Sequence, residues 1–483
     1  MQTYLGQKGY TVAKKDLSEE LKKQIVKDMF IIPKASVGKP QTYSILRESA
    51  NKFYLPRFYG IQKFGLPQDI KIKEGGNISL NFTGELREMQ KQAVANYMAC
   101  IDPVAGGGGL LEIFCGGGKT CTALYITQQL GKRTLIIVHK EFLMNQWMER
   151  IQQFLPNAKV GKIQGKKIDI EGKDIVLVML QSLSMKDYDD AIFADFGLTI
   201  IDEVHHIASE VFSRALTKVV TKYVLGLSAT MNRLDGTTYV IKMYLGEVAF
   251  KAVRKDDNVV NVRAIHYNNK DPEYTRVIRD YAGQTQCSSM ISKLCLFEPR
   301  NLFILGVIAD MFLEDPEQQL MVLSHNRNIL EYFHKWIEEK NIATVGYYVG
   351  GMKEKDLKTT ESKQIVLATY SMASEALDIP SLTTLVMATP KVSIEQSVGR
   401  ILRMKHNNPV IVDIVDSPQL FKNQWYKRKK FYNQQNYKII QINSDKYSES
   451  SFSSSAMTDC INDDDNDDDE EVANDLLKTI VIP

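Results

Sequence analysis

Three glycines, a lysine and a threonine form the cluster in this chain best suited to hold phosphate groups. The cluster consists of Gly116, Gly117, Gly118, Lys119 and Thr120. Consecutive glycines let the backbone turn tightly, so that its N–H groups point at phosphate oxygens, and a helix that begins there adds partial positive charge. The lysine can reach the β- and γ-phosphates of a nucleotide, and the threonine hydroxyl can bind Mg²⁺. The pattern indicates a P-loop, although Ile113 stands where the first glycine is usual.

A glycine-rich turn with an ordinary surface lysine is the alternative, so other polar groups must decide. Asp202 and Glu203 directly follow the apolar stretch 198–201. There the first acid can hold Mg²⁺, and the second can orient and deprotonate a water molecule. Ser228 and Thr230 follow the next apolar stretch. Their small hydroxyl groups could connect two sites, or could simply close a turn through local hydrogen bonds.

A further polar group lies far along the chain, at 393–403. On a helix Gln396, Arg400 and Arg403 are spaced at i, i+4 and i+7 and therefore share one face. Two arginines on that face can clamp the terminal phosphate of a nucleotide. A charged, solvated helix face is the alternative, and it would be preferred without the groups described above.

The elements that must position these groups alternate between apolar strands and amphipathic helices. Strands are expected at 134–138, 174–179, 198–201 and 225–228, and then at 319–324, 343–347, 364–369, 384–388 and 410–413. Continuous apolar strands separated by helices are typical of parallel sheets covered on both faces, and ligands bind beyond the carboxyl ends of such strands. We therefore expect an α/β protein with two parallel-sheet domains, the first carrying the P-loop.

The remaining segments are expected to be accessory. Predicted divisions are an N-terminal accessory domain at 1–83, the first sheet domain at 84–250, a linker at 251–295, the second sheet domain at 296–445 and a disordered acidic tail at 446–483. Helices are predicted at 16–27, 86–94, 141–154 and, as a basic terminal helix, 423–437. The last could contact phosphate or pack back on its domain, and neither is favoured. The aromatic, basic stretch 53–60 is expected to pack as a strand, although it could stack on bases. The glycine run 104–109 is expected to be a flexible connector.

The formal net charge of +2 hides an uneven distribution. Residues 459–483 carry ten acidic side chains against one lysine, which leaves +11 on residues 1–458. A basic body favours a polyanionic partner, usually nucleic acid, although solubility alone is the simpler explanation. The tail ends in the apolar residues 476–483, for which docking to a protein partner is favoured over folding back on the body.

The six cysteines form no C-x-x-C pair, so the sequence indicates neither a zinc site nor a disulfide framework. This usage fits a reducing, intracellular location. No apolar run approaches the roughly 20 residues needed to cross a bilayer, so no membrane partner is expected.

Together these motifs resemble those of superfamily 2 helicases of the DExH type. The closest pattern is the XPB-like branch, with the helicases of large nucleocytoplasmic DNA viruses and the transcript-release type of poxviruses. The matching segments are 86–90 (Q motif), 114–120 (motif I), 138–147 (Ia), 202–205 (II), 228–230 (III), 324–327 (IV), 369–380 (V) and 396–403 (VI). Motifs I, II, III and VI in this order are very specific. Met231 and Ala376 replace the usual proline after motif III and the usual glycine of motif V.

The resemblance implies two tandem RecA-like domains and ATP-driven movement along DNA or DNA/RNA hybrids, with a role in viral transcription or transcript release. It implies a virion or host-cytoplasm location. By this resemblance the residues that contact ATP are Gln90, Cys115, Gly116, Gly117, Gly118, Lys119, Thr120 and Asp378, and those that hold Mg²⁺ are Thr120 and Asp202. The residues implied in catalysis are Glu203, Gln396, Arg400 and Arg403. The residues that couple ATP hydrolysis to strand movement are His205, Ser228 and Thr230. The alternatives are a repair or recombination DNA translocase, an RNA helicase and, more distantly, a non-catalytic scaffold that recruits partners through its tail.

Overall fold

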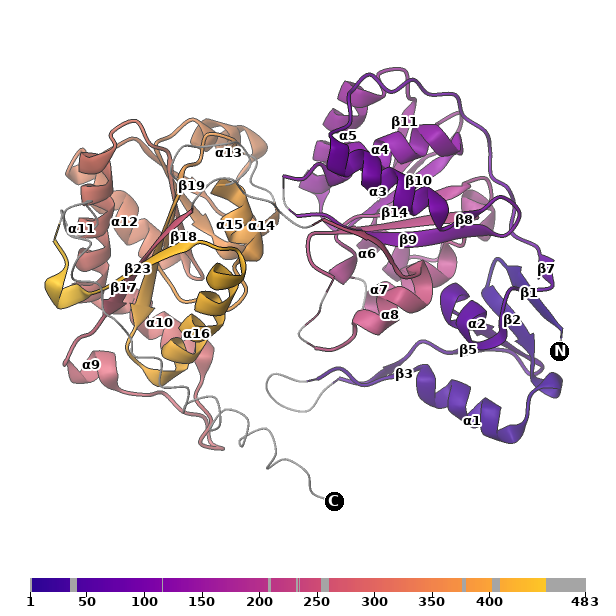
Figure 1. Ribbon diagram of the computed structural model, residues 1–483, viewed down its shortest axis with the longest axis horizontal. Coiled ribbons are helices and arrows are strands. Elements are labelled where there is room, and N and C mark those ends of the chain that lie inside the picture. Colours follow the sequence, from indigo (N-terminus) through magenta and orange to yellow (C-terminus); the bar gives the residue numbers. More distant parts are fainter. Residues whose placement is uncertain are drawn as a thin grey trace. The chain divides into compact units, whose positions relative to one another are not determined.

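The computed structural model describes residues 2–34, 41–114, 116–206, 210–231, 233, 235–252, 260–375, 379–401 and 409–448. The predictions for Cys115, Asp378, Arg403 and the acidic tail beyond 448 lie outside these residues, and so does the side chain of Gln396. The chain divides into two compact units, residues 1–255 and 256–483. Figure 1 labels their elements.

The first unit is built on a mainly parallel sheet with the strand order β12-β11-β13-β10-β14-β15-β9-β16, and β8 pairs with β9. Its strands are β8 (Ile101–Asp102), β9 (Gly106–Glu112), β10 (Thr134–Val138), β11 (Val160–Gln164), β12 (Lys167–Asp169), β13 (Ile175–Met179), β14 (Leu198–Ile201), β15 (Tyr223–Ser228) and β16 (Val248–Lys251). The helices are α3 (Glu88–Ala99), α4 (Lys119–Leu130), α5 (Glu141–Phe154), α6 (Leu180–Met185), α7 (Glu210–Lys218) and α8 (Thr238–Leu245). The strands expected near 134, 174, 198 and 225 are confirmed. They are buried apolar runs, as a sheet covered on both faces requires.

The glycine run at 106–109 is not the flexible connector that its composition predicts. It forms the first half of β9, a buried strand that pairs with β15 and β16. The physical reason is close packing. A Cβ at Gly107 would collide with the backbone of Cys100, and one at Gly108 would collide with the side chain of Val224. Glycine is required here because neighbouring chains approach the strand too closely for a side chain.

The N-terminal residues of the first unit form a smaller sheet with the order β5-β6-β2-β1-β7. Its elements are β1 (Thr3–Gly6), β2 (Gly9–Ala13), η1 (Lys14–Asp16), α1 (Glu19–Asp28), β5 (Arg47–Glu48), β6 (Lys52–Leu55), α2 (Arg57–Phe64) and β7 (Asp69–Ile70), while β3 (Phe30–Ile31) pairs with β4 (Tyr43–Ser44). The predicted first helix is confirmed, but it begins after Ser18, whose hydroxyl accepts a hydrogen bond from the N–H of Leu21. The stretch 53–60 packs as a strand followed by a helix.

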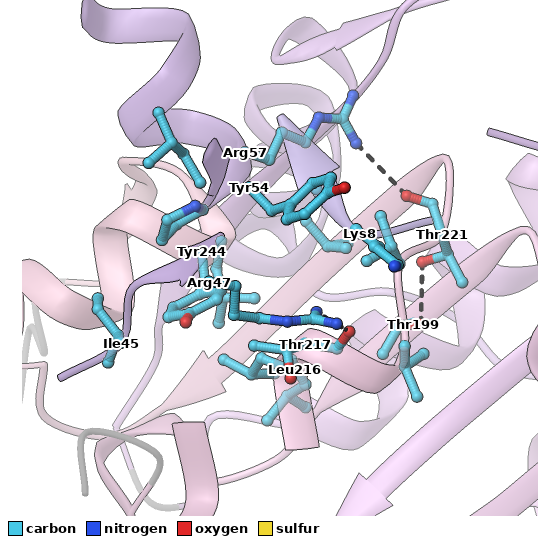
Figure 2. Close-up of a pocket in the computed structure, with 18 residues that line it drawn as sticks. Lys8, Ile45, Arg47, Tyr54, Arg57, Thr199, Leu216, Thr217, Thr221 and Tyr244 are labelled. Atoms are coloured by element: carbon cyan, nitrogen blue, oxygen red, sulfur yellow. Dashed lines mark hydrogen bonds between the residues drawn. The ribbon is translucent and has the colours of Figure 1, made fainter. Parts of the chain in front are cut away.

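Two arginines fasten the N-terminal elements to the part of the same unit that contains the large sheet. Arg47 donates to the carbonyl of Thr217 at 2.8 Å. Arg57 is almost fully buried and donates to the carbonyls of Lys222 and Ala105 at 2.8 and 2.6 Å. Figure 2 shows both arginines beside a pocket at this junction. Burial lowers the pKa of Arg57 to about 10, so this guanidinium keeps its charge at neutral pH.

The second unit is a parallel sheet with the order β19-β20-β18-β21-β22-β17-β23. Its strands are β17 (Asn261–Tyr267), β18 (Leu320–Ser324), β19 (Val345–Tyr348), β20 (Ile365–Thr369), β21 (Thr384–Met387), β22 (Val410–Asp416) and β23 (Lys438–Asn443). Its helices are α9 (Pro272–Thr275), α10 (Cys287–Leu296), α11 (Glu298–Glu314), α12 (Arg327–Glu339), α13 (Glu354–Glu361), α14 (Tyr370–Glu375), α15 (Glu395–Ile401) and α16 (Gln419–Gln434). The five expected strands of this domain are confirmed, and so is the α/β class of both units.

The prediction of a linker at 251–295 is wrong for most of its length. Strand β17 lies inside the second sheet, paired in parallel with β22 and β23, and α9 and α10 follow it. The strand mixes half-buried polar residues with apolar ones, so its composition resembles that of a connection.

The basic helix predicted near the end of this unit packs against its own sheet. Arg428 on α16 forms a bidentate ion pair with Asp413 on β22 at 2.7 and 2.9 Å, and both side chains are buried. The hydroxyl of Tyr432 donates to the same carboxylate at 3.0 Å. The buried face of the helix therefore stabilises the domain.

Candidate nucleotide-binding site

Three described glycines follow β9 and lead directly into a helix. Gly116 and Gly118 have φ angles of 81° and 85°, in the left-handed region where a side chain is strained. A Cβ at Gly117 would lie 2.5 Å from a methyl group of Ile113. Lys119 then begins α4 directly. The backbone conformation of the described glycines depends on their having no side chain.

Three predicted motifs meet at one edge of the large sheet. β14, β15 and β9 are adjacent parallel strands, so their carboxyl ends lie side by side. Asp202 and Glu203 follow β14, Ser228 ends β15 and the glycine loop follows β9. The N–H of Ile113 donates to the carbonyl of Ser228 at 3.0 Å. The structure thus brings motifs I, II and III together.

The side chains of Lys119 and Glu203 form an ion pair in this edge. The Nζ of Lys119 lies 2.8 Å from the Oε1 of Glu203, and both side chains are largely buried. Glu203 also has a φ angle of 50°, which is unusual for a residue with a side chain. Such strain persists only where the surroundings impose it, and it is common at functional sites.

Asp202 is held in a fixed orientation. Its Oδ2 accepts a hydrogen bond from the indole Nε1 of Trp147 at 2.9 Å, and its Oδ1 accepts one from the N–H of Glu203 at 3.0 Å. Burial raises the pKa of Asp202 to about 6, and the negative charge of Glu203 acts in the same direction, while Lys119 opposes both. A cation near Asp202 would therefore be stabilised.

His205, Ser228 and Thr230 form a chain of hydrogen bonds beside Glu203. The Ser228 hydroxyl donates to the carbonyl of Thr230 at 2.7 Å. The Nδ1 of His205 lies 3.0 Å from the Oγ of Ser228 and is therefore the donor to that hydroxyl oxygen. That Nδ1 also lies 3.4 Å from the Oε2 of Glu203. Burial lowers the pKa of His205, and Glu203 partly offsets the effect. The three predicted coupling residues are thus connected to the predicted base.

Gln90 lies against the glycine loop, and both ends of its amide are engaged. Its Oε1 accepts from the N–H of Arg87 at 2.8 Å, and its Nε2 lies 3.4 Å from the carbonyl of Gly118. The side chain is buried. Contact with an adenine ring stays a prediction for this residue.

In the second unit, Arg400 lies on α15 and is buried. The predicted shared face with Gln396 and Arg403 involves a side chain and a residue outside the described part, so it stays a prediction.

Sequence reasoning missed three side chains that the structure brings to this edge. They are Trp147, His139 and Arg233. His139 is buried after β10, where burial and Lys140 lower its pKa to about 4 against the opposing effect of Glu203. Arg233 donates to the carbonyl of His205 and pairs with Asp235. Trp147 and His139 both lie within motif Ia, and that membership was the signal in the sequence that could have identified them.

Known proteins resemble this chain along most of its length. The family model of the type III restriction enzyme, res subunit, matches residues 83–233. A protein of Acanthamoeba polyphaga mimivirus that bears the name of an ATP-dependent RNA helicase is 36% identical over 446 residues, covering 89% of this chain and 85% of its own. The chain belongs to the family of ATP-dependent helicases that this relative represents.

Two further likenesses agree with that assignment. A protein of invertebrate iridescent virus 6 named as a helicase is 25% identical, covering 83% of this chain and 93% of its own. The solved structure of S. cerevisiae Dbp5 bound to RNA and ADP BeF3 has a TM-score of 0.51 at 10% identity, covering 82% of this chain and 94% of that one. The latter supports the fold, a pair of RecA-like domains. The helicase is therefore an ATP-hydrolysing enzyme that acts on nucleic acid. Among its described helices, none has the length and apolarity to cross a membrane.

Proposed function

We propose that this helicase hydrolyses ATP at the edge formed by Lys119, Asp202 and Glu203, and uses the energy to move along DNA or DNA/RNA hybrids. The observation that carries the proposal is the 2.8 Å ion pair between Lys119 and Glu203. It joins the residue suited to bind phosphate to the residue suited to deprotonate water, at the edge where parallel α/β sheets bind their ligands.

The pair also suggests how the base is controlled. A phosphate that reaches the glycine loop competes with Glu203 for the Lys119 ammonium. A carboxylate relieved of a neighbouring cation has a higher pKa and is a stronger base. Glu203 thus becomes most basic when a phosphate has taken its partner. A general base of this kind contributes about 10²–10⁴ in rate.

The residues present fit a magnesium ion bound together with a nucleotide. Among the described residues no cluster of three or more His, Cys, Asp or Glu side chains could hold a metal alone. Mg²⁺ in such sites takes one or two protein oxygens, with phosphates and water completing the shell. Asp202 and the Thr120 hydroxyl supply oxygens of this kind. A cation beside Asp202 would offset the cost of burying its negative charge, which raises the pKa of this carboxyl. The ion would neutralise charge on the phosphates as they are transferred.

The other predicted contacts complete the proposal. Cys115 and Asp378 are proposed to bind the nucleotide. Gln396, Arg400 and Arg403 are proposed to stabilise the charge that develops on the transferred phosphoryl group, where arginines contribute about 10³–10⁵ in rate in related systems.

His205, Ser228 and Thr230 are proposed to transmit the state of Glu203 to the rest of the domain. The hydrogen bonds from His205 through Ser228 to Thr230 support this role.

The assay that tests the substrate compares ATP hydrolysis by the full chain with equal amounts of single-stranded DNA, duplex DNA, DNA/RNA hybrid and single-stranded RNA. Stimulation by DNA or hybrid is expected. Stimulation by RNA alone would overturn the proposal in favour of an RNA helicase, a function that the names of the mimivirus and African swine fever virus relatives support. A Lys119→Ala variant is the control, because any ATP hydrolysis that remains in this variant comes from a contaminating enzyme.

We also propose a role in viral transcription or transcript release. The proposed location is intracellular and reducing, with the virion or the host cytoplasm as the sites that a viral role implies. A protein of the transcription machinery is the proposed partner of the acidic tail. Deleting the residues after Asp459 should leave the ATPase rate unchanged and abolish that binding. Loss of ATPase activity would instead make the tail part of the motor.

A further inference from the structure

One face of the N-terminal sheet carries a row of aligned side chains. Tyr4 on β1, Thr11 on β2 and Tyr54 on β6 lie directly opposite one another across the three strands. Residues in one such row emerge on the same side of a sheet. The neighbouring row, Leu5, Tyr10 and Leu55, is buried on the other side, where Tyr10 stacks on Phe64 of α2.

Three lysines lie against the two tyrosine rings of the first row. The Nζ of Lys71 is 4.3 Å and that of Lys52 is 5.1 Å from the ring centroid of Tyr4, and the Nζ of Lys8 is 5.2 Å from that of Tyr54. Cations at such distances are attracted by the ring. Lys52 also donates to the Tyr4 hydroxyl at 3.4 Å. We call these five residues the lysine–tyrosine face.

The charge of this face is not neutralised by ion pairs. Within the described residues, none of its three ammonium groups lies within 4.0 Å of a carboxylate oxygen. Glu48 of β5 pairs instead with Lys14 of η1. Asp69, in register with Tyr4, is the acidic residue of the same row. Lys8 and Lys71 are exposed, so the net positive charge faces solvent.

The lysine–tyrosine face is also fixed to the nucleotide-binding unit. Arg47 continues the row beyond Tyr54 and donates to the carbonyl of Thr217. Figure 2 shows Lys8, Arg47 and Tyr54 together around the pocket at this junction. The sheet beside these cations is therefore hydrogen-bonded to the first RecA-like domain.

We propose that the lysine–tyrosine face binds the phosphate backbone of a nucleic-acid duplex. Ordered, unpaired ammonium groups are complementary to a row of phosphates. The tyrosine rings already have cations against them, so they do not offer the open stacking surface on which unpaired bases bind. Paired bases need no such surface. The inference rests on the proposed action on nucleic acid and adds a binding surface outside the helicase motifs.

The test compares Lys8→Gln/Lys52→Gln/Lys71→Gln with a matched control, Lys15→Gln/Lys23→Gln/Lys27→Gln. The control removes the same charge from exposed lysines of η1 and α1 in the same unit. Binding of the full-length proteins to a DNA duplex is measured over a range of salt concentrations, beside a single strand of the same length. ATP hydrolysis without nucleic acid is measured as well, and neither variant should alter it.

The first variant should bind the duplex about tenfold more weakly than the wild type. Its salt dependence should be flatter by about 0.9 for each phosphate that it no longer neutralises. Equal affinity and salt dependence in the two variants would overturn the proposal. An equal or larger loss of affinity for the single strand would overturn the assignment to duplex. Failure of the wild type to bind any nucleic acid would instead remove the proposed function itself.

Discussion

Replacing Trp147 by phenylalanine should change the metal requirement of the helicase while leaving its fold intact. The indole Nε1 donates to the Oδ2 of Asp202 at 2.9 Å, and the ring is fully buried in α5. Phenylalanine keeps most of the apolar packing but has no donor. The substitution therefore acts mainly on the carboxylate proposed to hold Mg²⁺.

The size of the effect follows from the surroundings of Asp202. A hydrogen bond to a charged group contributes about 1.5–3 kcal/mol, and about 1.4 kcal/mol corresponds to a tenfold change in an equilibrium constant. The pKa of Asp202 already stands at about 6 because of burial and of Glu203. Loss of the indole donor should raise it further, so that more of Asp202 is protonated at pH 7. The Mg²⁺ concentration needed for half-maximal activity should then rise about tenfold or more.

The assay is ATP hydrolysis as a function of Mg²⁺ concentration at pH 7 and at pH 8.5. The variant should approach the wild-type rate at high Mg²⁺ and at the higher pH, because both favour the ionised, metal-bound carboxylate. Trp425→Phe, which alters a buried indole of the second unit, is the matched control. An unchanged Mg²⁺ requirement at pH 7 would refute the reasoning, and so would an equal change in the control.

Two further predictions concern the same unit. Gly118→Ala should weaken ATP binding, because Gly118 has a φ angle of 85° and a Cβ there would displace the side-chain amide of Gln90 from the glycine loop. Gly65→Ala, with a φ angle of 82° but open space around it, should leave binding of a fluorescent ATP analogue unchanged. An equal loss in both variants would contradict the argument. His139→Gln should make the fold less sensitive to acid. The pKa of His139 is lowered from 6.5 to about 4, so between pH 7 and pH 4.5 the unfolded chain takes up a proton that the folded chain does not. Over this range the free energy of unfolding of the wild type should fall by about 2.5 kcal/mol more than that of the variant. The raised pKa of Asp202 stabilises the fold as the pH falls, and it does so equally in both proteins. The difference between their urea unfolding free energies at the two pH values therefore isolates His139. An equal fall in stability in the two proteins would exclude His139 as the cause.

Much of the fold is predictable because its central strands are continuous apolar runs. β10, β13, β14 and β15 are of this kind. Strands that depend on their neighbours are not predictable in this way. The glycine half of β9 is a strand because adjacent chains leave no room for side chains, and its composition alone indicates a connector. β17 carries half-buried polar residues, so its composition alone indicates part of a linker.

The candidate site divides in the same way. Lys119, Asp202 and Glu203 are predictable because their chemistry depends on residue type and on position after a strand. Their interactions are not, since these arise from contacts distant in sequence. Trp147 reaches Asp202 across 55 positions, and Lys119 reaches Glu203 across 84. The left-handed φ angle of Glu203 has no signal in the sequence, because glutamate rarely adopts it.

The central claim is that Glu203 is the base for ATP hydrolysis at the glycine loop, and its most direct test is single-turnover hydrolysis by Glu203→Gln, with ATP binding measured in parallel. Glu171→Gln, an exposed acid of the same unit, is the control. We predict that Glu203→Gln binds ATP while its turnover falls by about 10²-fold or more, and that the control behaves as the wild type. Turnover equal to the wild type in Glu203→Gln would contradict the account.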